Sequence, residues 1–153
     1  EAEGEALIER CTFGTQLQRA ILTHQPTLVR DCAIAHNGQG IVVGFTAIEG
    51  PPSQRLRVER CRFRELTRGA IAVVCPSHDY DQKGDPQLLV IESTFELPAG
   101  VPAIRATRSN GVSLIGNRFL GRGAPPQPGE VILLVNSPWR EDRDNHFGSL
   151  DVP

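Results

Sequence analysis

The fold is decided by the stretch LRVERCRF (Leu56–Phe63), because four other segments of the chain repeat its pattern. Each copy reads apolar-x-apolar-x-x-[Cys/Ser/Asn]-x-[Phe/Ile], and a second short apolar run follows about ten residues later. The Cys/Ser/Asn position recurs at intervals of 21, 29, 32 and 24 residues, and such self-similarity is typical of a solenoid. The other four copies are Ala6–Phe13, Thr27–Ile34, Leu88–Phe95 and Val112–Phe119.

The apolar positions within one copy change phase once. Leu56 and Val58 alternate with polar residues and point to one face, as do Cys61 and Phe63. The three-residue step from Val58 to Cys61 cannot belong to one continuous strand, since a period of two would bury an arginine. A tight bend at Glu59–Arg60 restores the phase.

One coil therefore contains three short strands, predicted over residues 56–58, 61–63 and 70–73. The runs are too short for helices and lack a period of 3.6 residues. The repeats are also too uneven for leucine-rich repeats. We predict an all-β chain that forms a right-handed parallel β-helix of about five coils over residues 1–135. Residues 136–153, with Trp139 and Phe147, are expected to form a C-terminal tail that caps the last coil.

Two segments, V-x-x-C-x-F (residues 58–63) and L-x-x-N-x-F (residues 114–119), resemble coils of the pectate-lyase-like β-helix superfamily. The resemblance covers nearly the whole chain and implies that small polar residues stack in a ladder at the bend after a strand. That ladder would contain Cys11, Cys32, Cys61, Ser93 and Asn117. An interior stack beside it would contain Phe13, Ile34, Phe63, Phe95 and Phe119, and such stacking buries large apolar areas.

Composition excludes some classes of partner. The formal net charge of −2 gives no general attraction to nucleic acid or to an anionic membrane. Apolar runs reach only about five residues, too few to cross a bilayer. Lys83 is the only lysine among 16 basic residues, which indicates a GC-rich bacterial genome. The sequence contains no Met, and we expect it to be a piece of a larger protein. Cytoplasmic and cell-surface or secreted locations both stay open.

The chain has four cysteines, and the first three occupy the same repeat position. Metal ligands would be expected in close pairs such as C-x-x-C, which are absent. We interpret the cysteines as small buried thiols. A disulfide between neighbouring coils remains an alternative, since coils about 4.8 Å apart lie within the range that disulfides tolerate. The sequence leaves open the redox state of Cys11, Cys32, Cys61 and Cys75.

The clearest candidate for chemistry is the long loop over residues 74–87. Asp79 and Asp81 are the predicted acid and base if the chain cleaves glycans. A minor alternative is a Ca²⁺ site formed by Asp79, Asp81 and Asp85, and the plainest is a solvated loop of turn-forming residues. No resident cofactor or other metal is predicted. The residues predicted to bind substrate are Arg55, His78, Tyr80, Asp85 and Arg108.

We favour a non-catalytic β-helix module, a scaffold or a surface that binds a ligand or protein partner, within a larger bacterial protein. The alternative is a fragment of a carbohydrate-active enzyme, because the superfamily resembled is dominated by polysaccharide lyases and glycoside hydrolases. The few aromatic residues, 5% of the chain, and the position of the aspartates in a loop disfavour this alternative. Exposed strand edges at both ends also predict end-to-end self-association. The outward arginines at positions 57, 60, 62 and 64 are interpreted as a solvated face rather than a polyanion site.

Overall fold

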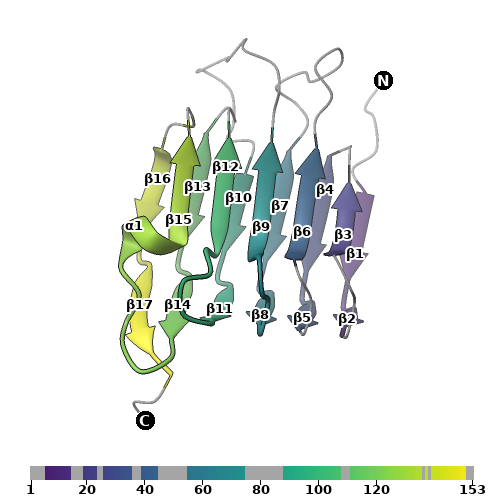
Figure 1. Ribbon diagram of the computed structural model, residues 1–153. Coiled ribbons are helices and arrows are strands. Elements are labelled where there is room, and N and C mark those ends of the chain that lie inside the picture. The colour runs from purple at the N-terminus through teal and green to yellow at the C-terminus, as the bar shows by residue number, and fades with distance from the viewer. Residues whose placement is uncertain are drawn as a thin grey trace.

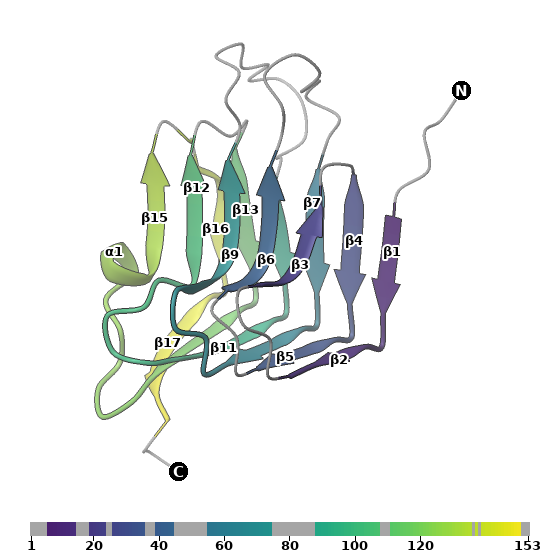
Figure 2. The ribbon, with the colours of Figure 1, turned by 45° about the vertical axis from the view of Figure 1, so that its right-hand side comes forward.

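The computed structural model is a parallel β-solenoid in which three sheets run side by side along one axis (Figures 1 and 2). Every strand pair among the described residues is parallel, and each strand pairs with the equivalent strand of the next coil. The structure describes residues 6–14, 19–23, 26–35, 39–44, 55–74, 88–107, 111–135, 137 and 139–150.

We call the three sheets A, B and C in the order in which a coil passes through them. Within the described residues, sheet A contains β1 (Ala6–Glu9), β4 (Thr27–Arg30), β7 (Leu56–Glu59), β10 (Leu88–Ile91), β13 (Val112–Ile115) and β16 (Trp139–Arg143). Sheet B contains β2 (Thr12–Phe13), β5 (Ala33–Ala35), β8 (Arg62–Arg64), β11 (Thr94–Leu97), β14 (Arg118–Gly121) and β17 (His146–Ser149). Sheet C contains β3 (Arg19–Thr23), β6 (Gln39–Gly44), β9 (Gly69–Val74), β12 (Ile104–Thr107) and β15 (Ile132–Val135), with α1 (Pro128–Val131) immediately before β15.

Each bend from sheet A to sheet B is made by one residue with a positive φ. In the third coil this residue is Arg60, with φ of 50°, so the predicted bend at Glu59–Arg60 is confirmed. The left-handed conformation turns the chain within one residue, and therefore the next position points inward again. The residues that occupy this position in successive coils are Arg10, Asp31, Arg60, Glu92, Gly116 and Asp144.

The predicted ladder of small polar residues follows directly after these bends. The backbone N–H of Cys61 donates to Ser93 Oγ at 3.1 Å, and the N–H of Ser93 donates to Asn117 Oδ1 at 2.9 Å. Asn117 Nδ2 also donates to the carbonyl oxygen of Val90 at 2.9 Å. Side chains thus supply hydrogen bonds that the backbone cannot make at the bend, where unsatisfied groups would be costly.

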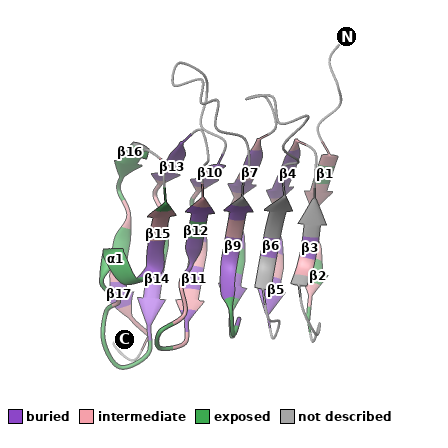
Figure 3. Ribbon diagram, turned by 45° about the horizontal axis from the view of Figure 1, so that its top comes forward, coloured by how far each residue is buried: buried purple, intermediate pink, exposed green. Residues whose placement is uncertain are grey.

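An aromatic stack fills the interior beside the ladder, as predicted. The rings of Phe63, Phe95 and Phe119 lie 4.8 and 4.9 Å apart at their centroids and are nearly parallel. All three side chains are fully buried. The spacing equals that between neighbouring strands, so each coil places its ring directly on the next. Figure 3 shows buried residues in all three sheets along the length of the solenoid.

The prediction of five coils is wrong. The described residues give sheets A and B six strands each, because β16 and β17 add to them a strand from the segment predicted as a tail. Phe147 stacks on Phe119 at 4.9 Å, and Asn145 Oδ1 accepts from the N–H of Asn117 at 3.0 Å. The signal was present in the sequence, since Asn145-His146-Phe147 repeats the N-x-F of residues 117–119. Sequence analysis missed it because β16 is charged and pairs with a β-bulge.

Within the described part of the chain, no helix is long and apolar enough to span a membrane.

Replacing Phe95 with Ala should lower the free energy of unfolding by about 3–5 kcal/mol, because the cavity would lie between two stacked rings. Phe13→Ala is the matched control. Phe13 belongs to the same stack position but is only half-buried in the first coil, so its loss should be smaller. Urea unfolding followed by circular dichroism measures both. Equal losses for the two variants would show that the stack does not form a buried core.

Candidate functional site

The outer face of sheet B presents a basic surface in its C-terminal half. Because Phe63, Phe95 and Phe119 point inward, the residues that alternate with them point outward. One outward row pairs Arg62 with Thr94, then with Arg118 and His146 of the following strands. In the next row Arg64 pairs with Glu96. The sheet therefore places side chains of three to four successive coils on one rigid face.

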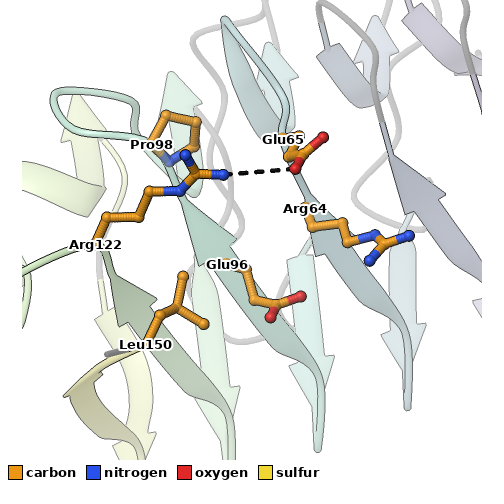
Figure 4. A pocket seen from close by; sticks show the side chains of 6 residues that line it. All are labelled: Arg64, Glu65, Glu96, Pro98, Arg122 and Leu150. Atoms are coloured by element: carbon orange, nitrogen blue, oxygen red, sulfur yellow. Dashed lines mark hydrogen bonds and ion pairs between the residues drawn. The ribbon is translucent and has the colours of Figure 1, made fainter. Parts of the chain in front are cut away.

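A cleft of about 100 Å³ lies over this face (Figure 4). Figure 4 shows the side chains of Arg64 and Glu96 on neighbouring strands, with Arg122 reaching across from the far side. The residues that line the cleft are Arg64, Glu65, Glu96, Pro98, Arg122 and Leu150.

Both carboxylates of the cleft are held by arginines. Arg62 donates from Nε and Nη2 to the two oxygens of Glu96, at 2.9 and 3.2 Å. This two-pronged hydrogen bond raises the pKa of the Arg62 guanidinium above its ordinary value. Arg122 Nη2 lies 3.5 Å from Glu65 Oε1. The first ion pair links neighbouring strands of sheet B, and the second joins residues that directly follow β14 and β8.

The backbone conformation of Glu65 directs its side chain toward Arg122. It has a φ of 52° and does not belong to the bends between sheets A and B. The next residue, Leu66, is buried with 2% exposure, only three positions after the buried Phe63. A three-residue step between inward residues again needs one left-handed residue. The strained conformation therefore has a packing cause, and its consequence is an outward carboxylate at the rim of the cleft.

Arg64 and Arg118 carry positive charge that the described residues do not neutralise. No ion pair joins either guanidinium to another residue of the described part of the chain. Both residues are exposed. The cleft itself is lined by two arginines and two glutamates, and Arg62 and Arg118 of the neighbouring outward row add two further arginines to this face of a molecule whose overall charge is negative.

A second hollow of about 180 Å³ continues from this cleft, since Pro98 and Arg122 line both. It lies between residues 97–101 and the segment that leads from β14 to α1. Pro125 and Pro126 contribute to its wall, so this part is more apolar than the first. The two hollows are therefore neighbours, one with charged walls and one with more apolar walls.

The arginines at positions 57, 60, 62 and 64 point outward, as predicted, but they do not share a face. Arg57 lies on sheet A and contacts Glu59 Oε1 at 3.1 Å. Arg60 lies at the bend and donates to Asp31 Oδ1 at 2.8 Å. The remaining two lie on sheet B beside the cleft. The third coil therefore distributes its positive charge around the solenoid.

Most residues predicted for catalysis or binding lie outside the described residues, namely Asp79, Asp81, His78, Tyr80, Asp85 and Arg108. Arg55 is described. It immediately precedes β7, and its carbonyl oxygen accepts a hydrogen bond from the N–H of Thr27 at 2.9 Å. It therefore lies at the end of sheet A opposite the bend into sheet B, away from the cleft. Sequence analysis gave the cleft no role because its residues are far apart in sequence.

Three cysteines are described, and all three are free thiols. Cys32 and Cys61 are buried, whereas Cys11 is half-buried in the first coil. Burial raises the pKa of Cys61 to about 12 and also raises the pKa of Cys32. The interpretation as buried thiols is confirmed for Cys32 and Cys61, while Cys75 lies outside the described residues. Within the described segments, no cluster of three or more His, Cys, Asp or Glu side chains could hold a metal ion.

Comparisons of the chain with models of protein families, with curated proteins and with solved structures gave no match. The proposals below therefore rest on the geometry of this molecule.

Iodoacetamide should modify Cys11 much faster than Cys32 and Cys61 in the folded protein near pH 8. The thiolate is the reactive form, and burial keeps the two inner thiols protonated at that pH. Mass spectrometry of proteolytic peptides after timed alkylation measures each site. In urea the three rates should converge, which controls for the reagent. Equally fast labelling of Cys61 in the folded protein would contradict the buried ladder.

Proposed function

We propose that the chain is a non-catalytic β-helix module that binds an acidic polysaccharide across the outer face of sheet B. The single observation that carries the proposal is that two exposed arginines on the outer face of sheet B, Arg64 in the cleft and Arg118 in the neighbouring outward row, form no ion pair with other described residues. Guanidinium groups bind carboxylates and sulfates through paired, charge-assisted hydrogen bonds.

The strand spacing suits a linear ligand. Arg64 and Arg118 lie on β8 and β14 with the single strand β11 between them and are offset by two residues along the strands, which places their backbones about 12 Å apart. A chain with regularly spaced negative charges can contact both without bending. The rigid stack fixes the backbone positions of these arginines before binding, so only their side chains have to be ordered on association. The apolar hollow beside the cleft offers contact for sugar rings.

The ion pairs of the cleft support binding rather than bond cleavage. Hydrolysis of a glycoside by an acid and a base needs two carboxyl groups available to the scissile bond. Glu96 is held by both of its oxygens, and Glu65 faces Arg122. Their role in this proposal is to orient the arginines.

A carbohydrate-active enzyme remains the alternative, with Asp79 and Asp81 as its acid and base. If it is correct, the purified protein cleaves members of a polysaccharide panel, and an Asp79→Asn/Asp81→Asn double variant loses cleavage but keeps its fold. We expect no cleavage by either protein. Reducing-end and unsaturated-product assays measure hydrolysis and elimination respectively, and product formation that depends on the two aspartates would replace the binding proposal.

The finer family assignment also belongs here. We propose that the solenoid is right-handed and of the pectate-lyase-like kind. In Figure 1 the chain descends through the more distant sheet A, crosses below in sheet B and rises through the nearer sheet C while advancing from β1 toward β16, and this order supports a right-handed coil. The ladder from Cys11 to Asn145 supports the pectate-lyase-like assignment. Membership of a larger bacterial protein stays a prediction.

An Arg64→Glu/Arg118→Glu double variant should bind acidic polysaccharides about 100-fold more weakly than the unmodified protein, since each lost charged contact is worth about 1.5 kcal/mol. Arg105→Glu is the matched control, because Arg105 is an exposed arginine on β12 in sheet C. Isothermal titration against acidic and neutral polysaccharides measures affinity. Equal affinity for both kinds, or an unchanged double variant, would contradict the proposal.

A further inference from the structure

We propose that copies of this chain stack head to tail, with β16 and β17 of one copy pairing in parallel with β1 and β2 of the next. This inference concerns the two ends of the solenoid and does not depend on the ligand proposed for sheet B. The end strands of sheets A and B have one neighbour each within the described residues. Four rows of side chains that run along the solenoid would continue across the junction.

Among the described residues, one side of the first strand has no pairing partner. The N–H groups of Ala6 and Arg10 donate to the carbonyl oxygens of Pro26 and Arg30 in the next coil, at 2.8 and 3.1 Å. Because backbone groups alternate along a strand, those of Leu7 and Glu9 face the opposite side, away from β4. The side chain of Leu7 is also 54% exposed. A strand with an open, apolar edge favours pairing with another strand.

The aromatic stack is the first row that would continue. Phe147 stacks on Phe119 with one ring face, and its other face points toward the C-terminal end of the solenoid. Phe13 occupies the same row in the first coil and is half-buried, packed on Ile34 of the neighbouring strand. Head-to-tail stacking would place Phe147 of one copy against Phe13 of the next at the strand spacing. Both rings would then be fully buried.

The ladder is the second row. At four of the five contacts between described coils, the N–H that follows the bend donates to the ladder side chain of the following coil: Cys11 to Cys32 Sγ at 3.5 Å, Cys61 to Ser93, Ser93 to Asn117 and Asn117 to Asn145. At the N-terminal end, Cys11 Sγ occupies the acceptor position that this pattern would offer to a preceding coil. The bend N–H of Asn145 from another copy would supply the matching donor.

Charge forms the third and fourth rows. The first four bends alternate in charge from Arg10 to Glu92, and Arg60 and Asp31 form an ion pair at 2.8 Å, whereas the fifth bend residue, Gly116, is neutral. The bend row ends in Asp144 and begins with Arg10, so stacking would bring opposite charges together. In the row at the end of sheet A, Glu9 pairs with Arg30 inside the molecule, and at the junction it would face Arg143. Two copies placed N-terminus to N-terminus would instead bring Arg10 against Arg10.

Two rows lack this match and limit the strength of the contact. In one of them Leu7 would face Glu141, which already forms an ion pair with Arg143. Ile8 would face Asp142, whose Oδ1 already accepts a hydrogen bond from Asn145 Nδ2 at 2.8 Å. Sheet C would not join, because its last described strand, β15, belongs to the coil before β16. The junction therefore uses two sheets of three. Since each copy adds along the same axis, such a contact does not close on itself and builds an open chain of subunits.

Sedimentation equilibrium over a wide range of protein concentration tests the proposal. The unmodified protein should show an average mass that rises with concentration. Arg10→Asp should lose this rise, because the introduced carboxylate would repel Asp144 of the neighbouring copy. Arg105→Asp, an exposed change on β12 of sheet C, which takes no part in the junction, should leave the rise unchanged. An unmodified protein that stays monomeric throughout would overturn the proposal.

A charge exchange separates this arrangement from other modes of self-association. Asp144→Arg alone should also be monomeric, since its two ends are both positive. An equimolar mixture of Arg10→Asp and Asp144→Arg should regain the rise in mass, because every junction in the mixture can pair opposite charges. Both substitutions are compatible with the conformation of the bend, because an arginine and an aspartate, Arg60 and Asp31, adopt the same positive φ at the bends of other coils. If the mixture of folded variants stays monomeric, the head-to-tail arrangement is contradicted.

Discussion

A single left-handed residue at each bend between sheets A and B is the constraint on which the structure depends. It allows two residues that are three positions apart, such as Val58 and Cys61, both to point inward. An unbroken strand cannot provide this, because its side chains alternate between the two faces. Once every coil bends at the same place, equivalent residues fall into rows along the axis. The aromatic stack, the polar ladder and the alternating charges are all consequences of this register.

The same constraint explains how polar groups are satisfied in a narrow core. The bend interrupts strand hydrogen bonding, and the ladder side chains restore it by accepting from the N–H of the preceding coil. Asn117 does this while fully buried, with both its amide oxygen and its amide nitrogen engaged. Thiols fill the ladder in the first three coils, and a hydroxyl and amides fill it later. The chemistry of the row changes while its geometry stays constant.

Function in such a molecule is a property of rows rather than of local motifs. Arg62 and Arg118 are 56 residues apart in the sequence, yet they lie on the same face of sheet B with only one strand between them. The proposed polysaccharide surface lies on the outer face of sheet B, whereas the proposed stacking contact lies at the two ends of the solenoid. The first follows from excess positive charge, and the second from the repetition of matching residues at opposite ends.

The sequence by itself determined the repeating coil, the bend at Glu59–Arg60, and the inward positions of Leu56, Val58, Cys61 and Phe63, because these depend on local periodicity. It did not reveal that β16 and β17 extend sheets A and B, since their pairing with β13 and β14 overrides a charged segment that looks like a tail. Only the tertiary structure decided which arginines meet which glutamates around the cleft. Those contacts depend on lateral register between coils and on loops such as the one carrying Arg122, and unequal coil lengths hide that register in the sequence.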